Sequence, residues 1–174
     1  MNNIVKETLD ARYTIPAAPL DNVWLNGALR EVLDRLDAMM PRFTNTFPAA
    51  AAVNGIYPAV EKVDWTEGFW VGMLWLAYEA IGDNKYRKAA EGLLPKFRTR
   101  LEQKVKTNTH DLGFLYSLSC VAAWKLTGNA EARSSALWAA DLLYERYNRT
   151  AGIVQAWGAL DDPAKQGRMI IDCN

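Results

Sequence analysis

The stretch that decides the fold is Asp64-Trp65-Thr66-Glu67-Gly68-Phe69-Trp70-Val71-Gly72-Met73-Leu74-Trp75-Leu76-Ala77-Tyr78. Its first four residues form an acidic capping-box pattern, in which side chains satisfy the free backbone groups at a helix start. The residues after it are apolar all round a helix, and a helix of that kind is buried on every side. We therefore predict a buried helix that closes at Gly82-Asp83.

The rest of the chain repeats this arrangement. A more polar helix is expected from about Asn84 to Gln103, a second apolar helix from Asp111 to Leu126, and an amphipathic helix from Ala130 to Tyr147. The turn Gly128-Asn129 follows the turn Gly82-Asp83 at a spacing of 46 residues. Such a fixed period of a buried helix, a tight turn and an amphipathic helix is typical of an array of αα-hairpins.

The flanking segments add one helix and little strand. Residues Asn22 to Met40 have the apolar spacing of an amphipathic helix, which Pro41 ends. An irregular stretch from Arg42 to Val63 follows, and a loop of that length is usually functional or part of a rim. Only Ile153 to Trp157 has the pattern of a short extended segment, so the predicted fold class is all-α.

Two architectures use αα-hairpins: an open solenoid that binds partner proteins, and a closed toroid with the inner helices around a central funnel. Inner helices that are apolar all round favour the toroid. A ring of six hairpins needs roughly 380 residues, from helices of about 12 residues and their loops. We expect residues 1–174 to form a single domain, about half of such a ring, which is weakly stable and inactive unless the missing hairpins are supplied.

Composition excludes several classes of protein. The 174 residues carry 20 Lys and Arg against 20 Asp and Glu, and 50% of them are apolar, which is typical of a globular domain. A neutral chain without a basic cluster is not expected to bind nucleic acid. No stretch is long enough for a membrane span and no secretory signal is evident, so we expect a cytoplasmic protein. Cys120 and Cys173 match no metal spacing and are expected to be buried thiols.

Five residues stand out as candidates for chemistry. His110, the only histidine, and Asp111 stand together at the start of the second apolar helix, and Asp172 follows Met169-Ile170-Ile171. Trp65 and Trp157 lie at loop-to-helix junctions, where an exposed indole can stack on the apolar face of a sugar. Each also has an ordinary interpretation: a structural histidine, helix-capping aspartates, and tryptophans in the core. No motif for a metal or cofactor is present, and none is expected.

Four segments together resemble the unsaturated glucuronyl hydrolases of glycoside hydrolase family 88. They are the stretch 64–75, His110-Asp111-Leu112-Gly113-Phe114-Leu115-Tyr116, Gly152-Ile153-Val154-Gln155-Ala156-Trp157-Gly158, and Gly167-Arg168-Met169-Ile170-Ile171-Asp172. The resemblance covers nearly the whole chain. It implies an (α/α)6 toroid, present here as its N-terminal half, and a glycosidase that needs no metal.

The resemblance also implies a reaction and roles. The family removes a Δ4,5-unsaturated uronic acid from the non-reducing end of oligosaccharides by hydrating a vinyl ether. By position, Asp172 matches the acid that protonates C4 and activates water, and Asp111 matches the second essential carboxylate. His110, Trp65 and Trp157 match residues that line the sugar subsite. Two carboxyls close together raise the pKa of one of them, which suits an acid acting near neutral pH.

Two other interpretations remain open from the sequence. One is an unsaturated rhamnogalacturonyl hydrolase, a related toroid that uses the same hydration on pectin fragments. The other is a non-catalytic αα-hairpin scaffold that binds a protein partner. The sequence does not indicate an oligomeric state.

Overall fold

The computed structural model describes residues 21–60 and 64–170 of the chain. It divides into two units, Met1–Arg35 and Leu36–Asn174, which are described separately. In its described part, the first unit consists mainly of the start of helix α1 (Asn22–Met39). The last residues of this helix, from Leu36 on, belong to the second unit. The short 3-10 turn η2 (Met40–Arg42) contains Pro41 and ends this helix, as the sequence predicts.

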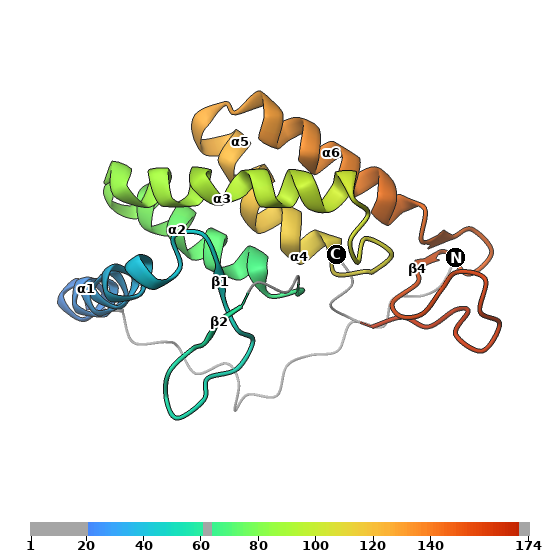
Figure 1. The fold of residues 1–174 in the computed structure, drawn as a ribbon, viewed down its shortest axis with the longest axis horizontal. Coiled ribbons are helices and arrows are strands. Elements are labelled where there is room, and N and C mark those ends of the chain that lie inside the picture. Colours follow the sequence, from blue (N-terminus) through green and yellow to red (C-terminus); the bar gives the residue numbers. More distant parts are fainter. Residues whose placement is uncertain (1–20, 61–63, 171–174) are drawn as a thin grey trace. The chain divides into compact units, whose positions relative to one another are not determined.

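The second unit consists mainly of two αα-hairpins, and the all-α prediction is confirmed (Figure 1). The first hairpin pairs α2 (Glu67–Ile81) with α3 (Asn84–Glu102). In the second, a helical run of α4 (Leu112–Tyr116), the π-helix η3 (Ser117–Val121) and α5 (Ala122–Thr127) pairs with α6 (Ala130–Tyr144). The inner helices α2 and α4–α5 contact each other, and so do the outer helices α3 and α6, which gives two layers.

The turns of the two hairpins are built alike. Gly82 and Gly128 end the inner helices in the left-handed region, with φ of 71° and 74°, which glycine adopts without strain. The next residues cap the outer helices: Asp83 Oδ1 accepts from the backbone N–H of Lys85, and Asn129 Oδ1 from that of Ala132, both at 2.9 Å. The repeat predicted from the sequence is therefore present in the backbone.

The core lies between the two layers. Large side chains from both hairpins are buried there: Trp70, Leu74, Trp75, Tyr86, Leu93, Phe97, Leu101, Leu112 and Leu115. The inner helices cross closely at Gly68, where an added Cβ would overlap the carbonyl oxygen of Phe114 and lie 2.8 Å from the Cα of Leu115. Glycine at this position lets α2 approach the start of α4.

The prediction that α2 is buried on every side is wrong. Phe69, Met73 and Leu76 are 40%, 39% and 63% exposed and form a stripe along the helix. The α3 and α4–η3 helices pack on the other faces of α2. On the stripe itself, Phe69 meets the rings of Trp65 and Phe114, and Met73 and Leu76 remain exposed. The apolar composition of α2 thus reflects a buried face and a separate exposed stripe.

The capping box at the start of α2 is only half formed. The Glu67 carboxylate accepts a hydrogen bond from the backbone N–H of Asp64 at 3.1 Å, as the pattern predicts. The Asp64 carboxylate instead accepts from the adjacent N–H of Trp65 at 2.7 Å. The helix consequently begins at Glu67, and Trp65 remains in the preceding loop.

Two small hairpins complete the described chain. Strand β1 (Phe47–Pro48) pairs antiparallel with β2 (Ala59–Val60), inside the stretch expected to be irregular. Strand β3 (Tyr147–Asn148) pairs antiparallel with β4 (Ile153–Val154), with Tyr147 opposite Val154. The short extended segment predicted near Ile153 is therefore present. Because β3 begins at Tyr147, helix α6 ends before it, at Tyr144, rather than at Tyr147.

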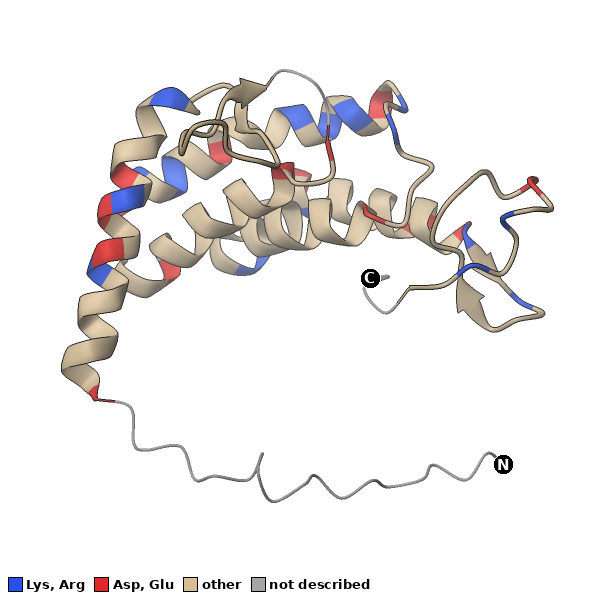
Figure 2. Cartoon of the chain, turned by 90° about the horizontal axis from the view of Figure 1, so that it is seen from below, with Lys and Arg blue, Asp and Glu red and all other residues tan. Residues whose placement is uncertain are grey.

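The surface and the thiol agree with an ordinary globular domain. Basic and acidic residues are intermixed along the described helices (Figure 2). None of the helices in the described ranges has the length and apolarity needed to cross a bilayer. Cys120 is buried as expected, and this burial raises the pKa of its thiol to about 11, which keeps it protonated at neutral pH. Cys173 lies outside the described residues.

Candidate active site

Asp111 stands at the start of α4 without capping the helix. Its side chain accepts no hydrogen bond from the α4 backbone. Instead, its Oδ2 accepts from the Thr109 hydroxyl at 2.7 Å, and its Oδ1 lies 3.2 Å from Nε2 of His110. The interpretation of Asp111 as a helix cap is therefore not supported, and its carboxylate is held in place by neighbouring side chains.

His110 is buried beside this carboxylate. Its Nε2 lies 3.2 Å from Asp111 Oδ1, and a proton on Nε2 would stabilise this contact. The buried Nδ1 has no hydrogen-bond partner among the described residues. A buried polar atom without a partner costs free energy, so His110 carries an unsatisfied polar group beside Asp111.

Trp157 joins the same group from a distant part of the chain. It lies in the loop after β4, and its ring meets the His110 ring edge-on, with 5.7 Å between centroids and 83° between planes. Its indole is 48% exposed. The fold thus brings His110, Asp111 and Trp157 together, with the imidazole between the carboxylate and an accessible aromatic face.

Trp65 belongs to an aromatic cluster at the neighbouring helix start. Its ring lies 5.9 Å from that of Phe69 and 6.1 Å from that of Phe114, and these two phenylalanines stack at 5.7 Å. The cluster bridges α2 and α4 and leaves the Trp65 indole 45% exposed. Like Trp157, Trp65 therefore offers a ring face outside the core.

One hollow connects Trp65 with Asp111. It has a volume of about 710 Å³, which falls in the range of small-molecule sites. Asp64, Trp65, Thr109 and Asp111 line it, together with basic residues that include Lys104 and Lys106. A carboxylate, an indole and cationic side chains thus surround a space large enough for a sugar.

A buried ion pair supports this end of the molecule. Glu67 Oε2 lies 3.1 Å from a guanidinium nitrogen of Arg100, and both side chains are buried. Burial raises the pKa of the Glu67 carboxyl, although the N–H of Asp64 and the charge of Arg100 act in the opposite direction. The same Arg100 nitrogen donates to the backbone carbonyl of Asp64 at 2.9 Å, which fixes the residue before Trp65.

The candidate acid Asp172 lies outside the described residues, so its position relative to Asp111 stays a prediction. Thr109, Phe69 and Phe114 also belong to the site, although they are not among the residues predicted from the sequence. A sequence feature points to Phe69 and Phe114: each follows a glycine, and the two Gly-Phe pairs stand at equivalent positions of the repeat.

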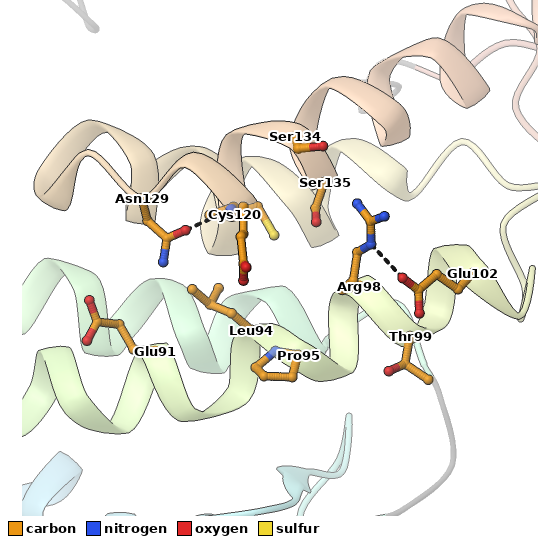
Figure 3. A pocket seen from close by; sticks show the side chains of 12 residues that line it. Glu91, Leu94, Pro95, Arg98, Thr99, Glu102, Cys120, Asn129, Ser134 and Ser135 are labelled. Atoms are coloured by element: carbon orange, nitrogen blue, oxygen red, sulfur yellow. Dashed lines mark hydrogen bonds and ion pairs between the residues drawn. The ribbon is translucent and has the colours of Figure 1, made fainter.

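A second hollow, of about 490 Å³, lies between the outer helices α3 and α6 and contains none of the five candidate residues (Figure 3). Three of its charged groups are paired: Arg98 donates to Glu102 at 2.7 Å and lies over the Trp138 ring at 5.1 Å, and Glu91 accepts from Arg87 at 2.9 Å. The Cys120 thiol in its wall is protonated at neutral pH and is therefore a poor nucleophile. The candidate active site is the hollow at Asp111.

The fold and site together define a class: αα-hairpins of the α/α-toroid type, with polar and aromatic groups gathered where the inner helices begin. No family model matches the chain. An unsaturated glucuronyl hydrolase from Bacillus sp. strain GL1 is 45% identical over 134 residues, 77% of this chain and 36% of that protein. An unsaturated chondroitin disaccharide hydrolase from Streptococcus pneumoniae is 40% identical over 146 residues, 84% of this chain and 37% of that protein.

Solved structures agree with these relatives. An unsaturated glucuronyl hydrolase from Streptococcus agalactiae superposes with a TM-score of 0.82 at 35% identity, covering 86% of this chain and 38% of that one. A mutant of the same enzyme was solved in complex with dGlcA-GalNAc6S; its TM-score is 0.72 at 35% identity, covering 76% of this chain and 35% of that one. The chain is thus a homologue of the unsaturated glucuronyl hydrolases over most of its length. It spans little more than a third of the length of these relatives.

Proposed function

We propose that this chain contributes the active-site carboxylates of a glycosidase that removes Δ4,5-unsaturated glucuronic acid from the non-reducing end of oligosaccharides. The observation that carries the proposal is the arrangement around Asp111. Its carboxylate lies against a buried imidazole, which in turn meets one exposed indole, and it lines the same hollow as another. Such a site can hold a sugar ring and present a carboxyl to it.

The proposed reaction is hydration of a vinyl ether by general acid–base catalysis. The carboxyl of Asp172 gives its proton to C4, and the C4=C5 electron pair forms the new C4–H bond. The positive charge that develops at C5 is stabilised by the ring oxygen. The Asp172 carboxylate then takes a proton from water as the water oxygen bonds to C5. The resulting C5 hemiketal opens to a C5 ketone and leaves a hemiacetal at C1, which breaks down to an aldehyde and releases the glycosidic oxygen as an alcohol.

The other residues position the sugar and tune the acid. Asp111 has the role of the second carboxylate, which helps to position the sugar and to keep the acid protonated. His110 supports the sugar subsite through its contact with Trp157, and the exposed indoles of Trp65 and Trp157 contact the apolar faces of the sugar. Lys104 and Lys106 give the hollow positive charge, which suits an anionic uronide.

The relatives indicate which substrate to test first. They include enzymes named for chondroitin disaccharide and a complex with an unsaturated glucuronyl N-acetylgalactosamine unit. Glycosaminoglycan fragments are therefore a better choice than the pectin fragments of an unsaturated rhamnogalacturonyl hydrolase.

We further propose that residues 1–174 form a single domain, the N-terminal half of the (α/α)6 toroid.

The test is incubation of the full-length protein, meaning this chain with any residues that its gene encodes beyond Asn174, with lyase-generated chondroitin disaccharide. We expect the ultraviolet absorbance of the C4=C5 double bond to fall as the bond is hydrated. A pectin-derived unsaturated disaccharide serves as the matched control and is expected to react more slowly. Binding of neither disaccharide and no loss of absorbance would favour the non-catalytic scaffold.

A further inference from the structure

Two buried arginines occupy equivalent positions of the repeat. Arg100 lies in the last turn of α3, and Arg146 lies two residues after the end of α6. They are 46 residues apart, the spacing that separates the turn at Asp83 from the turn at Asn129. Both side chains are buried, with residue exposures of 4% and 2%. Burying a guanidinium costs free energy unless its donors are satisfied, so a space-filling role alone does not account for either residue.

Arg100 ties the start of its own hairpin to the loop that leaves it. One of its nitrogens donates to the carbonyl of Asp64 at 2.9 Å and to the Glu67 carboxylate at 3.1 Å. Another donates to the carbonyl of Lys106 at 3.2 Å. The residues before Trp65 and the loop that leads to His110 are therefore held by one side chain.

Arg146 makes the corresponding contacts in the second hairpin. Its Nε donates to the carbonyl of Gln155 at 2.9 Å, and its Nη2 to those of Ala156 and Gly158 at 2.9 and 3.2 Å. Its Nη1 donates to the side-chain oxygen of Asn108. The carbonyls on both sides of Trp157 are thus connected to a residue two positions before His110.

We propose that Arg146 is a positioning residue of the site, which sets Trp157 against His110 and thereby fixes the imidazole beside Asp111. The planar guanidinium presents five donors in a fixed geometry, so one group can hold several carbonyls in register. A lysine at this position keeps the charge but not the geometry. The role of Trp157 and His110 in sugar binding rests on the proposed function; their placement by Arg146 does not.

The placement can be measured without turnover, by ¹⁹F NMR of the chain labelled with 5-fluorotryptophan. Trp157→Phe assigns the resonance of Trp157. We expect Arg146→Lys to shift or broaden this resonance by more than its line width and to leave those of the core residues Trp70 and Trp75 in place. The matched control is Arg98→Lys, which removes a guanidinium from the Trp138 ring and should move the Trp138 resonance instead.

A milder variant covers the case in which Arg146→Lys does not fold. Asn108→Ala removes the acceptor that ties Arg146 to the loop before His110. The guanidinium and the carbonyls that it holds near Trp157 can then shift, so the Trp157 resonance should also move. If the Trp157 resonance stays in place in both variants, or if all tryptophan resonances move together in both, Arg146 has no specific positioning role.

Kinetics of the full-length protein separate this inference from the proposed function. Arg146→Lys is expected to raise KM for the unsaturated chondroitin disaccharide on the order of tenfold, with a smaller effect on kcat, because it loosens residues that hold the sugar. A roughly tenfold fall in kcat with KM unchanged would contradict the positioning role. A displaced Trp157 resonance in a protein that does not hydrate the disaccharide would refute the function and leave the positioning role intact.

Discussion

At the scale of single residues, the position of Asp111 is unusual. An aspartate at the first residue of a helix ordinarily accepts a hydrogen bond from the helix backbone. Here Thr109 and His110 contact its carboxylate instead, and the side chain remains partly accessible. Side chains of neighbouring residues, and not the backbone N–H groups of α4, thus orient this carboxylate.

This geometry leads to a prediction for Asp111. Asp111→Asn removes the negative charge and is expected to lower kcat on the unsaturated disaccharide by about 10²-fold or more, the scale of an acid–base contribution. The change is nearly isosteric, so the melting temperature should stay close to that of the unmodified protein. Asp141→Asn, on the exposed side of α6, is the control and should leave both values unchanged. Turnover within a factor of three of normal in Asp111→Asn would contradict the role.

The sequence identified some of these residues and missed others for a physical reason. His110, Asp111 and the two tryptophans stand out because polar or aromatic residues interrupt apolar segments. Arg146 and Thr109 do not, because an arginine or threonine near a helix end is usually solvated. Only the fold shows that Arg146 is buried and that its partners come from two separate loops.

At the scale of secondary-structure elements, the close crossing of α2 and α4 depends on Gly68. A Cβ at this position would overlap backbone atoms of Phe114 and Leu115, which cannot move as a flexible side chain can. The crossing also brings Phe69 and Phe114 into the stack beside Trp65. Gly68 therefore contributes both to the packing of α2 on α4 and to the arrangement of the aromatic rings at the candidate site.

We predict that Gly68→Ala lowers the free energy of unfolding by about 1–3 kcal/mol, the usual cost of overpacking. Gly92→Ala is the matched control: this glycine lies inside α3 with open space around it, so alanine should raise stability by up to about 1 kcal/mol. Urea denaturation followed by circular dichroism measures both changes. Equal effects of the two substitutions would show that the helix crossing is not tight.

Sequence periodicity was a good guide to the elements and a poor one to their surroundings. It predicted both hairpins and their glycine turns, because these features are local. It gave the wrong environment for α2, because an apolar face that meets other helices and an apolar stripe that stays exposed look the same in sequence. The π-helix η3 left no signal in the apolar segment 112–127.

At the scale of the whole molecule, the described hairpins carry a candidate site that is open on one side. The Trp65 indole lines the hollow and is 45% exposed, and Met73 and Leu76 of α2 are exposed as well. The chain spans little more than a third of its relatives' length. Both observations support the expectation that the 174-residue chain alone has little activity. A folded and active 174-residue preparation would contradict this expectation.

The central claim is that the carboxyl of Asp172 delivers a proton to the C4=C5 bond of a sugar held at Asp111. Asp172→Asn in the full-length protein tests it most directly, with turnover followed by loss of double-bond absorbance and binding by calorimetry. Asp161→Asn, an exposed loop carboxylate, is the control. We predict a fall in turnover of about 10²- to 10⁴-fold for Asp172→Asn with Kd changed by no more than about threefold. Near-normal turnover in this variant would contradict the claim.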